Sequence, residues 1–593
     1  MRVSAWILPA ILLLLFAAAL WGDMFPKPGR NEVSAAPLQG AQASGPLYVL
    51  VHGFAPRPKR WNAIASVLKP HGAVLSLTYD AHPSSNADPE LVARNIGARL
   101  EEALRQNDRD IVVVAHSMGA LLARRAILQG LEDGKPWTQR VRRLVLLAGM
   151  NRGWTVEGER APDAPLWLEV QLRIGIWLAR MIGRGQLVLG MERGAPFVSD
   201  LRLSWMQTMQ KLAKDATRSR SIEVVQLLGD IDDFVHREDN EDLRASAVGR
   251  FALVRVRGTG HADIIQFNHD SHDTDAAALG RYRQSKLILA ATAPFEEVLT
   301  HNEELPPPVN DNVRDIVFVL HGIRDLGRWS SQFETDLRAR YPQRADNLLM
   351  VSPRYGYLGM GPFLFESVRR RYVRWFMDEY TETLARYPQV KPENIRFFGH
   401  SNGTYLLADA LQQYRSMRVG HVVLAGTVVR SGYPWSGLGE RVGAIRNYVG
   451  THDWVVALFP RFFDLPGVRA LRNPLGGGGF HGFDDCKVQN VMVAGAHGAF
   501  DGHEQEILDF LMAAPAAIAP AAAACEGKKA GWKEARSIAA KLLGTIPVVL
   551  ATWAFLVALV AYIGWRVVGA AAAPNWPMLL VFALLVITVL RTV

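Results

Sequence analysis

The sequence contains almost no cysteine, and nothing in it resembles a thiolate metal site. Cys486 and Cys525 are the only two cysteines in 593 residues, and they form no Cys-x-x-Cys or Cys/His zinc spacing. The sequence therefore implies neither a disulfide framework nor a structural zinc site. A short stretch rich in histidine and aspartate, residues 261–273, is interpreted as a solvated loop rather than a metal site, so no metal or other cofactor is expected.

A recognition motif for nucleic acid is also absent, although the net charge is +9. The basic residues are scattered, and their main local group, between residues 528 and 541, lies beside an apolar segment. We therefore expect no nucleic-acid partner. Hydrophobic residues make up 49% of the chain and charged residues 21%, which excludes a disordered chain. The length leaves room for two cores of roughly 200–250 residues each.

Long uncharged runs are confined to the two ends of the sequence. Residues 3–22 have the length of one membrane span, with a cleaved secretory signal as the alternative. Residues 542–565 form a second predicted span and residues 578–590 a shorter third one, for which a buried soluble helix is the alternative. We therefore expect an N-terminal anchor or signal at residues 1–22, a C-terminal transmembrane hairpin at residues 542–593, and the lipid bilayer as a partner.

Linkers divide the rest of the chain. Residues 23–45 are interpreted as a tether, residues 291–312 as a polar linker, and residues 513–541 as a linker that is first rich in Ala and Pro and then basic. Two domains are expected between them, at residues 45–290 and 313–512. Because basic residues beside a span favour the cytoplasm, we expect an integral membrane protein whose two domains face the cytoplasmic side.

Both regions alternate apolar runs with helical patterns, which is typical of a parallel sheet covered on both faces. In the first region the predicted strands cover residues 47–51, 73–79, 111–115, 141–148, 222–229 and 251–257. In the second they cover residues 316–320, 348–352, 395–399, 421–425, 445–450 and 491–494. The fold class is therefore α/β in both.

One short signature occurs once in each region. Ser117 lies at the centre of Ala-His-Ser-Met-Gly, residues 115–119, and Ser401 at the centre of Gly-His-Ser-Asn-Gly, residues 399–403. Each follows a strand and precedes a helical pattern, which predicts a tight strand–turn–helix junction flanked by small residues. Such a turn exposes the serine hydroxyl and directs the N-terminus of the next helix at it, where an oxyanion is stabilised.

A His-Gly pair at the end of an apolar strand precedes each serine, at residues 52–53 and 321–322. With these motifs in this order, the sequence resembles the α/β-hydrolase family over about residues 45–290 and again over 313–512. The resemblance implies two tandem α/β-hydrolase domains, each a mostly parallel sheet flanked by helices. One departure is Ala115, where the strict motif has glycine.

The resemblance also implies that an acid and a histidine complete each set, in the chain order Ser, Asp, His. In the family the acid commonly lies three residues after a glycine and three before a valine. Asp232 in the first region and Asp453 in the second match this spacing. The base candidates are His261 and His497, each directly after the next predicted strand.

Four alternatives to these residues stay open. In the first region Asp230 or Asp233 could replace the predicted acid. In the second, His481 and His503 are further histidines, although neither directly follows a predicted strand.

The residues next to each serine have other expected roles. The histidines before the serines, His116 and His400, are interpreted as packing residues. The backbone N–H groups of an oxyanion hole are expected at Phe54, Met118, Ile323 and Asn402.

The regions differ in where extra material is inserted. Residues 151–220 of the first region are expected to form a cap over the site, with a plain helical excursion packed on the core as the alternative. In the second region the extra segment is residues 354–387, rich in aromatic residues and arginine, which could line a pocket or an interface.

These features together predict a membrane-anchored serine hydrolase that cleaves carboxylic esters through an acyl-serine intermediate. Lipid substrates are favoured because the enzyme would be held at a bilayer, and thioesters and amides stay open because they use the same chemistry. Two alternatives are one catalytic domain beside a structural one, and a non-catalytic membrane scaffold built on the same folds.

Overall fold

The computed structural model describes residues 29–40, 45–54, 58–105, 109–155, 184–214, 221–246, 250–267, 274–303, 312–323, 328–353, 363, 366–465, 474–498, 500–514 and 538–569. These residues fall into two compact units. The first unit is built from the described residues of 14–309 together with residues 380–388, and the second from the described residues of 310–379 and 389–593.

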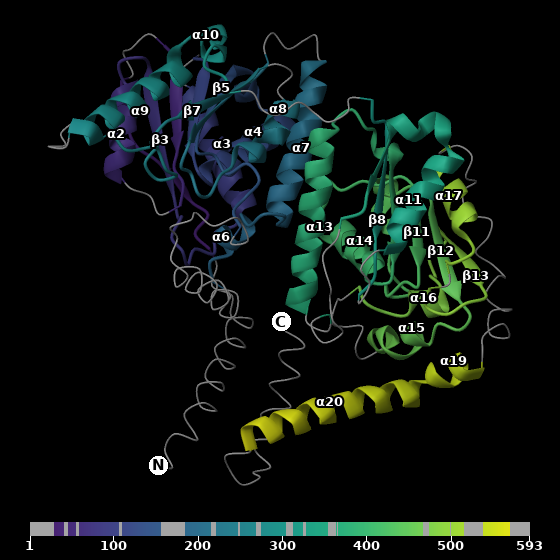
Figure 1. The fold of residues 1–593 in the computed structure, drawn as a ribbon. Helices are drawn as coiled ribbons and strands as arrows, with labels where there is room; N and C mark the ends of the chain where they lie inside the picture. Colours follow the sequence, from purple (N-terminus) through teal and green to yellow (C-terminus); the bar gives the residue numbers. More distant parts are fainter. Residues whose placement is uncertain are drawn as a thin grey trace. The chain divides into compact units, whose positions relative to one another are not determined.

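The first unit is built on a seven-stranded sheet in which only the edge pair is antiparallel (Figure 1). In sheet order its strands are β1 (Val33–Ala35), β3 (Ala73–Tyr79), β2 (Leu47–Val51), β4 (Ile111–His116), β5 (Val141–Leu147), β6 (Glu223–Gly229) and β7 (Phe251–Val256). The fully apolar runs predicted as strands therefore become the central parallel strands, which need apolar side chains on both faces.

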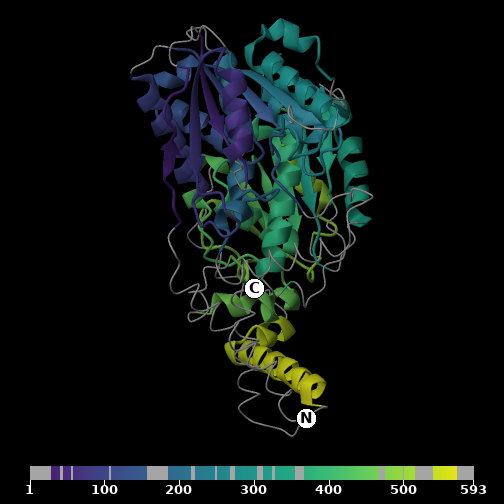
Figure 2. The same cartoon turned by 90° about the vertical axis from the view of Figure 1, so that its left-hand side faces the viewer.

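Helices cover both faces of this sheet (Figure 2). Along β4, Val113 and Ala115 belong to one buried cluster, while Val112 and Val114 belong to another, because successive side chains of a strand point to opposite faces. The first cluster is completed by α3 (Pro89–Leu104), α4 (Gly119–Glu132) and α7 (Pro196–Ala213). The second is completed by α2 (Pro58–Leu68), α9 (Thr274–Thr292) and α10 (Phe295–Leu299).

The first unit extends beyond its predicted bounds at both ends. Part of the expected tether forms β1, whose Val33 is buried while it pairs with β3. Part of the expected linker forms α10, whose Phe295 and Val298 are buried against the sheet. In both places a few apolar side chains in an otherwise polar stretch gain enough burial to join the core.

The described part of the expected cap is packed on the core. Residues 156–183 lie outside the described residues. Of the remainder, α6 (Gln186–Gly190) is short, and α7 buries Phe197, Leu201 and Trp205 in the same cluster as the helix that follows Ser117. Residues 196–213 therefore form a helical excursion packed on the core, which was the alternative to a cap over the site.

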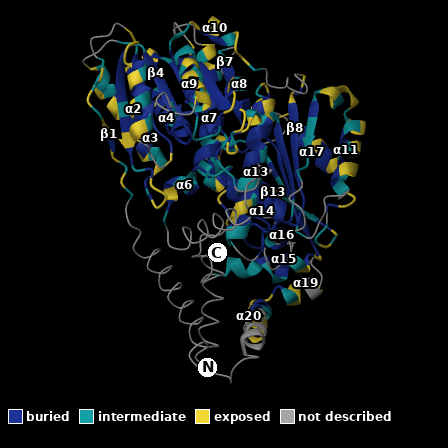
Figure 3. Cartoon of the chain, turned by 60° about the vertical axis from the view of Figure 1, so that its left-hand side comes forward, coloured by how far each residue is buried: buried dark blue, intermediate teal, exposed yellow. Residues whose placement is uncertain are grey.

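The second unit is built on a six-stranded, fully parallel sheet. In sheet order its strands are β13 (Val488–Val493), β12 (Ile445–Gly450), β11 (Val422–Ala425), β10 (Ile395–His400), β8 (Asp315–Leu320) and β9 (Leu348–Val351). If the edge strand β1 is set aside, the two units order their strands identically along the chain. In Figure 3 the strands of both sheets are mostly buried.

Both faces of the second sheet are also covered. On one face, Val317 and Val319 of β8 and Phe398 of β10 pack with α11 (Arg328–Arg340) and α17 (Glu504–Met512). On the other, Phe318 contacts Phe376 of α13 (Glu366–Arg386), with ring centroids 6.1 Å apart. Further helices are α14 (Asn402–Gln413), α15 (Trp454–Leu458) and α16 (Gly478–His481), with the one-turn helix η6 at Pro460–Asp464.

A buried arginine braces the sheet of each unit near the start of a strand. Arg143 of β5 pairs with Glu223 of β6 at 2.6 Å and donates to C-terminal carbonyls of the α9 segment. Arg396 of β10 pairs with Asp315 of β8 at 2.5 Å and donates to the carbonyl of Leu511 in α17. Each arginine therefore fixes a C-terminal helix to the sheet, at the strand ends opposite the serines.

Two further helices follow the second sheet, α19 (Ile538–Leu543) and α20 (Ile546–Gly569). Trp553 of α20 stacks on Phe462 of η6, with centroids 4.6 Å apart. The predicted span at residues 542–565 is therefore not one continuous helix, because α19 ends at Leu543 and α20 begins at Ile546. Pro547 lies in the first turn of α20, where proline is tolerated, whereas it would disrupt the interior of a longer helix. Within the described residues, no helix combines the length and the apolar character that crossing a membrane requires. The predicted segments at residues 3–22 and 578–590 lie outside the described residues.

Cys486 is disulfide-bonded, although the cysteine content implied no disulfide framework. The other cysteine of the chain, Cys525, lies outside the described residues. Two cysteines give no spacing pattern in a sequence, so only the structure could reveal that Cys486 is disulfide-bonded.

Candidate functional site

Each serine of the repeated signature occupies a left-handed turn between a strand and a helix. Ser117 follows β4 with φ of +53°, and Ser401 follows β10 with φ of +51°. Their backbone N–H groups donate to the ends of the next strands in the sheet, to Leu147 O at 3.1 Å and to Ala425 O at 3.0 Å. Positive φ is strained for a residue with a side chain, so the surrounding contacts must hold each turn in place.

Glycines make room for this turn from two directions. A Cβ placed on Gly53 would lie 2.7 Å from the Cβ of Ser117, and one on Gly322 would lie 2.8 Å from the Cβ of Ser401. A Cβ on Gly119 would similarly lie 2.4 Å from the carbonyl of His52. The glycine of each His-Gly pair and the glycine two residues after Ser117 are therefore required by close backbone approach.

In the first unit the structure brings Ser117, His261 and Asp232 together. Nε2 of His261 lies 2.9 Å from Oγ of Ser117, and its Nδ1 lies 3.0 Å from Oδ2 of Asp232. The Asp232 side chain is fully buried and that of His261 is 12% exposed. A buried carboxylate, an imidazole and a hydroxyl thus form one continuous hydrogen-bonded line that reaches the surface only at the histidine.

The second unit repeats this arrangement with Ser401, His497 and Asp453. Nε2 of His497 lies 2.9 Å from Oγ of Ser401, and its Nδ1 lies 3.0 Å from Oδ2 of Asp453. Asp453 is again fully buried, while the His497 side chain is 24% exposed. The two units therefore hold the same three groups at the same distances.

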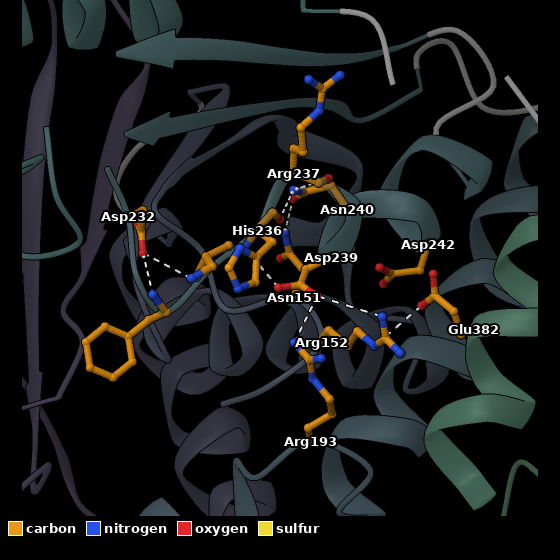
Figure 4. Close-up of polar contacts among 12 residues, drawn as sticks. Asn151, Arg152, Arg193, Asp232, His236, Arg237, Asp239, Asn240, Asp242 and Glu382 are labelled. Atoms are coloured by element: carbon orange, nitrogen blue, oxygen red, sulfur yellow. Dashed lines mark hydrogen bonds and ion pairs between the residues drawn. The ribbon is translucent and has the colours of Figure 1, made fainter. Parts of the chain in front are cut away.

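The acid of each set is fixed by backbone donors. Oδ1 of Asp232 accepts the N–H groups of Phe234 and Val235 at 2.9 and 3.0 Å (Figure 4). Oδ1 of Asp453 accepts the N–H of Val456 at 3.0 Å. These bonds leave the second oxygen of each carboxylate directed at its histidine.

The two aspartates and two histidines left open as alternatives lie away from the hydrogen-bonded sets. Asp230 accepts the backbone N–H of Thr259 at 3.3 Å, and no described contact joins Asp230 or Asp233 to His261. In the second unit His503 approaches Glu506 at 3.6 Å, and His481 packs against Phe480. None of these four side chains contacts a serine of the signature in the described part of the chain.

Arginines hold the segment that carries His261. Arg283 donates to the carbonyl of Gly258 at 2.9 Å and to Oγ1 of Thr259 at 3.0 Å. Arg60 donates to the carbonyl of Ala262 at 2.5 Å. The chain on both sides of the histidine is thus fixed by charge-assisted hydrogen bonds, which are stronger than neutral ones.

A buried polar cluster fixes the chain that follows Asp232 (Figure 4). Asp239 accepts from Arg193 at 3.0 Å and from the backbone N–H of His236 at 2.9 Å. The amide of Asn151, just after β5, donates to Oδ1 of Asn240 at 2.5 Å. Nothing in the sequence indicates this cluster, because its members come from three separate segments and form no spacing pattern.

The backbone N–H groups expected to form an oxyanion hole belong to residues next to these contacts. Gly53 and Gly322 abut the serines, and Phe54 and Ile323 are the residues that follow them in the chain. In the described part of the first unit, no acceptor is assigned to the backbone N–H of Phe54 or of Met118. These two groups correspond to the pair expected from the sequence, and Ile323 and Asn402 hold the same positions in the second unit.

The His-Gly turn itself is held by its histidine. Nδ1 of His52 lies 2.8 Å from the carbonyl of Gly53, and Nε2 accepts the backbone N–H of Tyr79 at 3.2 Å. Burial lowers the pKa of His52, which keeps the imidazole neutral and leaves Nε2 able to accept. Nδ1 of His321 lies at the matching 2.9 Å from the carbonyl of Gly322.

The described residues contain no group of three or more His, Cys, Asp or Glu side chains suited to a metal ion. Residues 268–273 of the His- and Asp-rich stretch considered from the sequence lie outside the described residues.

Comparison with known proteins found a family model that matches part of the first unit. A family model described as "Alpha/beta hydrolase family" matches residues 48–279. No protein of curated function matches the chain in sequence.

Solved structures that match part of the chain include a lipase and an esterase. The monoacylglycerol lipase of Paleococcus ferrophilus is 15% identical, with a TM-score of 0.27, over 44% of this chain and 100% of that one. Carboxyl esterase 2 from the fungus Tuber melanosporum is 16% identical, with a TM-score of 0.31, over 46% of this chain and 98% of that one. Similarity at this level carries no information on activity.

Gly426 offers a test of how tightly the second site is built. It follows β11 with φ of +51°, and a Cβ there would lie 2.6 Å from the carbonyl oxygen of His497. We expect Gly426→Ala to lower the free energy of unfolding of the second unit by about 1–3 kcal/mol, because overpacking adds to left-handed strain. Chemical denaturation followed by tryptophan fluorescence measures the change.

The matched control is Gly432→Ala, where an added Cβ would meet nothing within 4 Å. This substitution should change the free energy of unfolding by at most about 1 kcal/mol. Equal stability of the two variants would contradict the close approach of Gly426 and His497.

Proposed function

We propose, from the match of residues 48–279 to a model of the alpha/beta hydrolase family, that the protein is a serine hydrolase that cleaves carboxylic esters in both of its units. The observation that carries the proposal is the hydrogen-bonded line of serine, histidine and buried aspartate, which occurs twice with Oγ–Nε2 distances of 2.9 Å. Two separately folded sheets would not both assemble this line for packing alone.

The proposed reaction begins at the serine. Oγ of Ser117 attacks the ester carbonyl carbon while Nε2 of His261 takes the hydroxyl proton. The tetrahedral intermediate collapses, the alcohol leaves with the proton from His261, and an acyl-serine remains. Water then attacks the acyl group with the same histidine as base, which releases the carboxylic acid and restores the serine. Ser401 and His497 perform the same steps in the second unit.

The buried aspartates orient the bases. Because Asp232 and Asp453 face Nδ1 of their histidines, each imidazole carries its proton on Nδ1 and presents a free lone pair at Nε2. The carboxylate also stabilises the imidazolium that forms when the serine is deprotonated. The N–H groups of Phe54 and Met118, and of Ile323 and Asn402, would bind the oxyanion.

The substrate class is proposed as esters with an apolar acyl group, including lipids. Support comes from the expected attachment to a bilayer, through residues 3–22, which would keep the enzyme beside lipid substrates. The cytoplasmic placement stays a prediction. The disulfide at Cys486 weighs against it, because disulfides persist mainly in oxidising compartments.

Labelling by a fluorophosphonate tests the proposal directly, because this reagent modifies only an activated serine. We expect modification of both Ser117 and Ser401, located by mass spectrometry of peptides. Ser117→Ala and Ser401→Ala should each remove one label and leave the other. Labelling of one site alone would favour one catalytic and one structural unit, and labelling of neither would favour a scaffold.

The two acids should be needed for turnover but not for folding. Asp232→Asn and Asp453→Asn, each made in a chain whose other serine is alanine, should lower kcat by about 10⁴-fold, because the histidine is held in the wrong tautomer. Hydrolysis of a p-nitrophenyl ester measures the loss. Asp230→Asn is the control, since Asp230 bonds only a backbone N–H near the site, and it should keep most of the activity. The reverse ranking of Asp230 and Asp232 would refute the assignment of the acid.

Membrane attachment is tested by truncation. A chain that lacks residues 542–593 should stay in the membrane fraction, because residues 3–22 suffice as an uncleaved anchor. Its release as a soluble protein without residues 1–22 would instead identify a cleaved signal. Protease access to residues 306–308 in intact cells then reports on which side of the membrane the units lie.

A further inference from the structure

The histidine directly before each serine makes a hydrogen bond that packing does not require. His116 is the last residue of β4, and its Nε2 lies 3.2 Å from the backbone carbonyl oxygen of His261. His400 is the last residue of β10, and its Nε2 lies 3.1 Å from the backbone carbonyl oxygen of His497. The same contact therefore joins the serine-bearing strand to the base-bearing loop in both units.

The chemistry of the contact fixes the state of the ring. A carbonyl oxygen can only accept, so Nε2 must carry the proton in both histidines. Burial, reinforced by the nearby charge of His261, lowers the pKa of His116 to about 3, which keeps that ring neutral. A neutral donor suits this place, because the adjoining base becomes an imidazolium during the proposed reaction and a second cation beside it would oppose that step.

Ring contacts show how closely the two histidines of each pair are packed. The centroids of His116 and His261 are 5.5 Å apart, and those of His400 and His497 are 5.1 Å apart. A buried aromatic side chain also contacts this histidine in both units, Trp61 in the first and Phe500 in the second. The preceding histidine thus contacts both a core residue and the base.

We propose that His116 and His400 are positioning residues, each of which holds the base histidine at the distance from the serine that proton transfer needs. His116 is adjacent to Ser117 in the chain, so its bond to the carbonyl of His261 ties nucleophile and base into one rigid assembly. His400 does the same for Ser401 and His497. This role rests on the proposed function, and it adds a residue beyond serine, histidine and aspartate to each site.

The experiment compares His400→Phe with His400→Gln in the full chain carrying Ser117→Ala, so that only the second unit turns over. Phenylalanine keeps the ring but cannot donate, whereas the glutamine amide can donate from Nε2. We expect His400→Phe to lower kcat by about 10–100-fold with little change in KM, because small misplacements of a reacting group are costly. His400→Gln should regain most of that loss.

His421→Phe is the matched control. Nδ1 of His421 lies 3.1 Å from the carbonyl of Leu511, a buried bond of the same kind at the opposite end of the sheet. This variant should lose stability but keep its kcat. A kcat for His400→Phe equal to that of the parent, or an equal loss in His400→Phe, His400→Gln and His421→Phe, would overturn the positioning role.

A second readout separates this proposal from the proposed function. The Nδ1–H proton of His497, bonded to Asp453, should give a downfield NMR signal in the parent and in His400→Gln, and it should be lost or broadened in His400→Phe. This signal reports position whether or not the serine reacts. Its persistence in His400→Phe would refute the inference, whereas absence of turnover and labelling in the parent would refute only the hydrolase assignment.

Discussion

Both units depend on a backbone turn that an L-amino acid adopts only under constraint. Serine with φ near +50° costs about 1–2 kcal/mol relative to ordinary conformations, and it persists because the surroundings leave no room for another path. Because Gly53 and Gly322 have no side chain, the backbone of each His-Gly pair can lie directly against the serine Cβ atom. The bonds from the serine N–H groups to Leu147 and Ala425 fix the turn to the sheet. The histidine and the aspartate can be aligned with the serine only because its hydroxyl is held in this position.

Much of this arrangement could be predicted from the sequence, because it depends on local patterns. Apolar runs fixed the central strands, since parallel strands are buried on both faces. The spacing around Gly229 and Gly450 identified Asp232 and Asp453, and the structure brings both to their histidines. Asp230 and Asp232 are two residues apart, so the sequence alone could not decide which is the acid. The direction of their side chains decides it, because Asp232 faces His261 and Asp230 faces the backbone of Thr259.

Other features had no local signal. The strand β1 has only three residues and gains its place from pairing with β3, a contact distant in sequence. The helix α10 lies in a stretch that is polar overall, and burial of Phe295 and Val298 decides its position. The bonds of His116 and His400 end on backbone carbonyls, which every residue has, so no residue type could have indicated their partners.

The two sites share their polar line but not their surroundings. Between β5 and β6 the first unit inserts α6 and α7, whereas the second passes from β11 to β12 through a much shorter connection. On the proposed function, an inhibitor whose reactive group contacts only serine, histidine and aspartate would meet the same three groups twice and inactivate both units together. Selectivity for one unit would then have to come from substituents that extend beyond the reactive group, to side chains that the two units do not share.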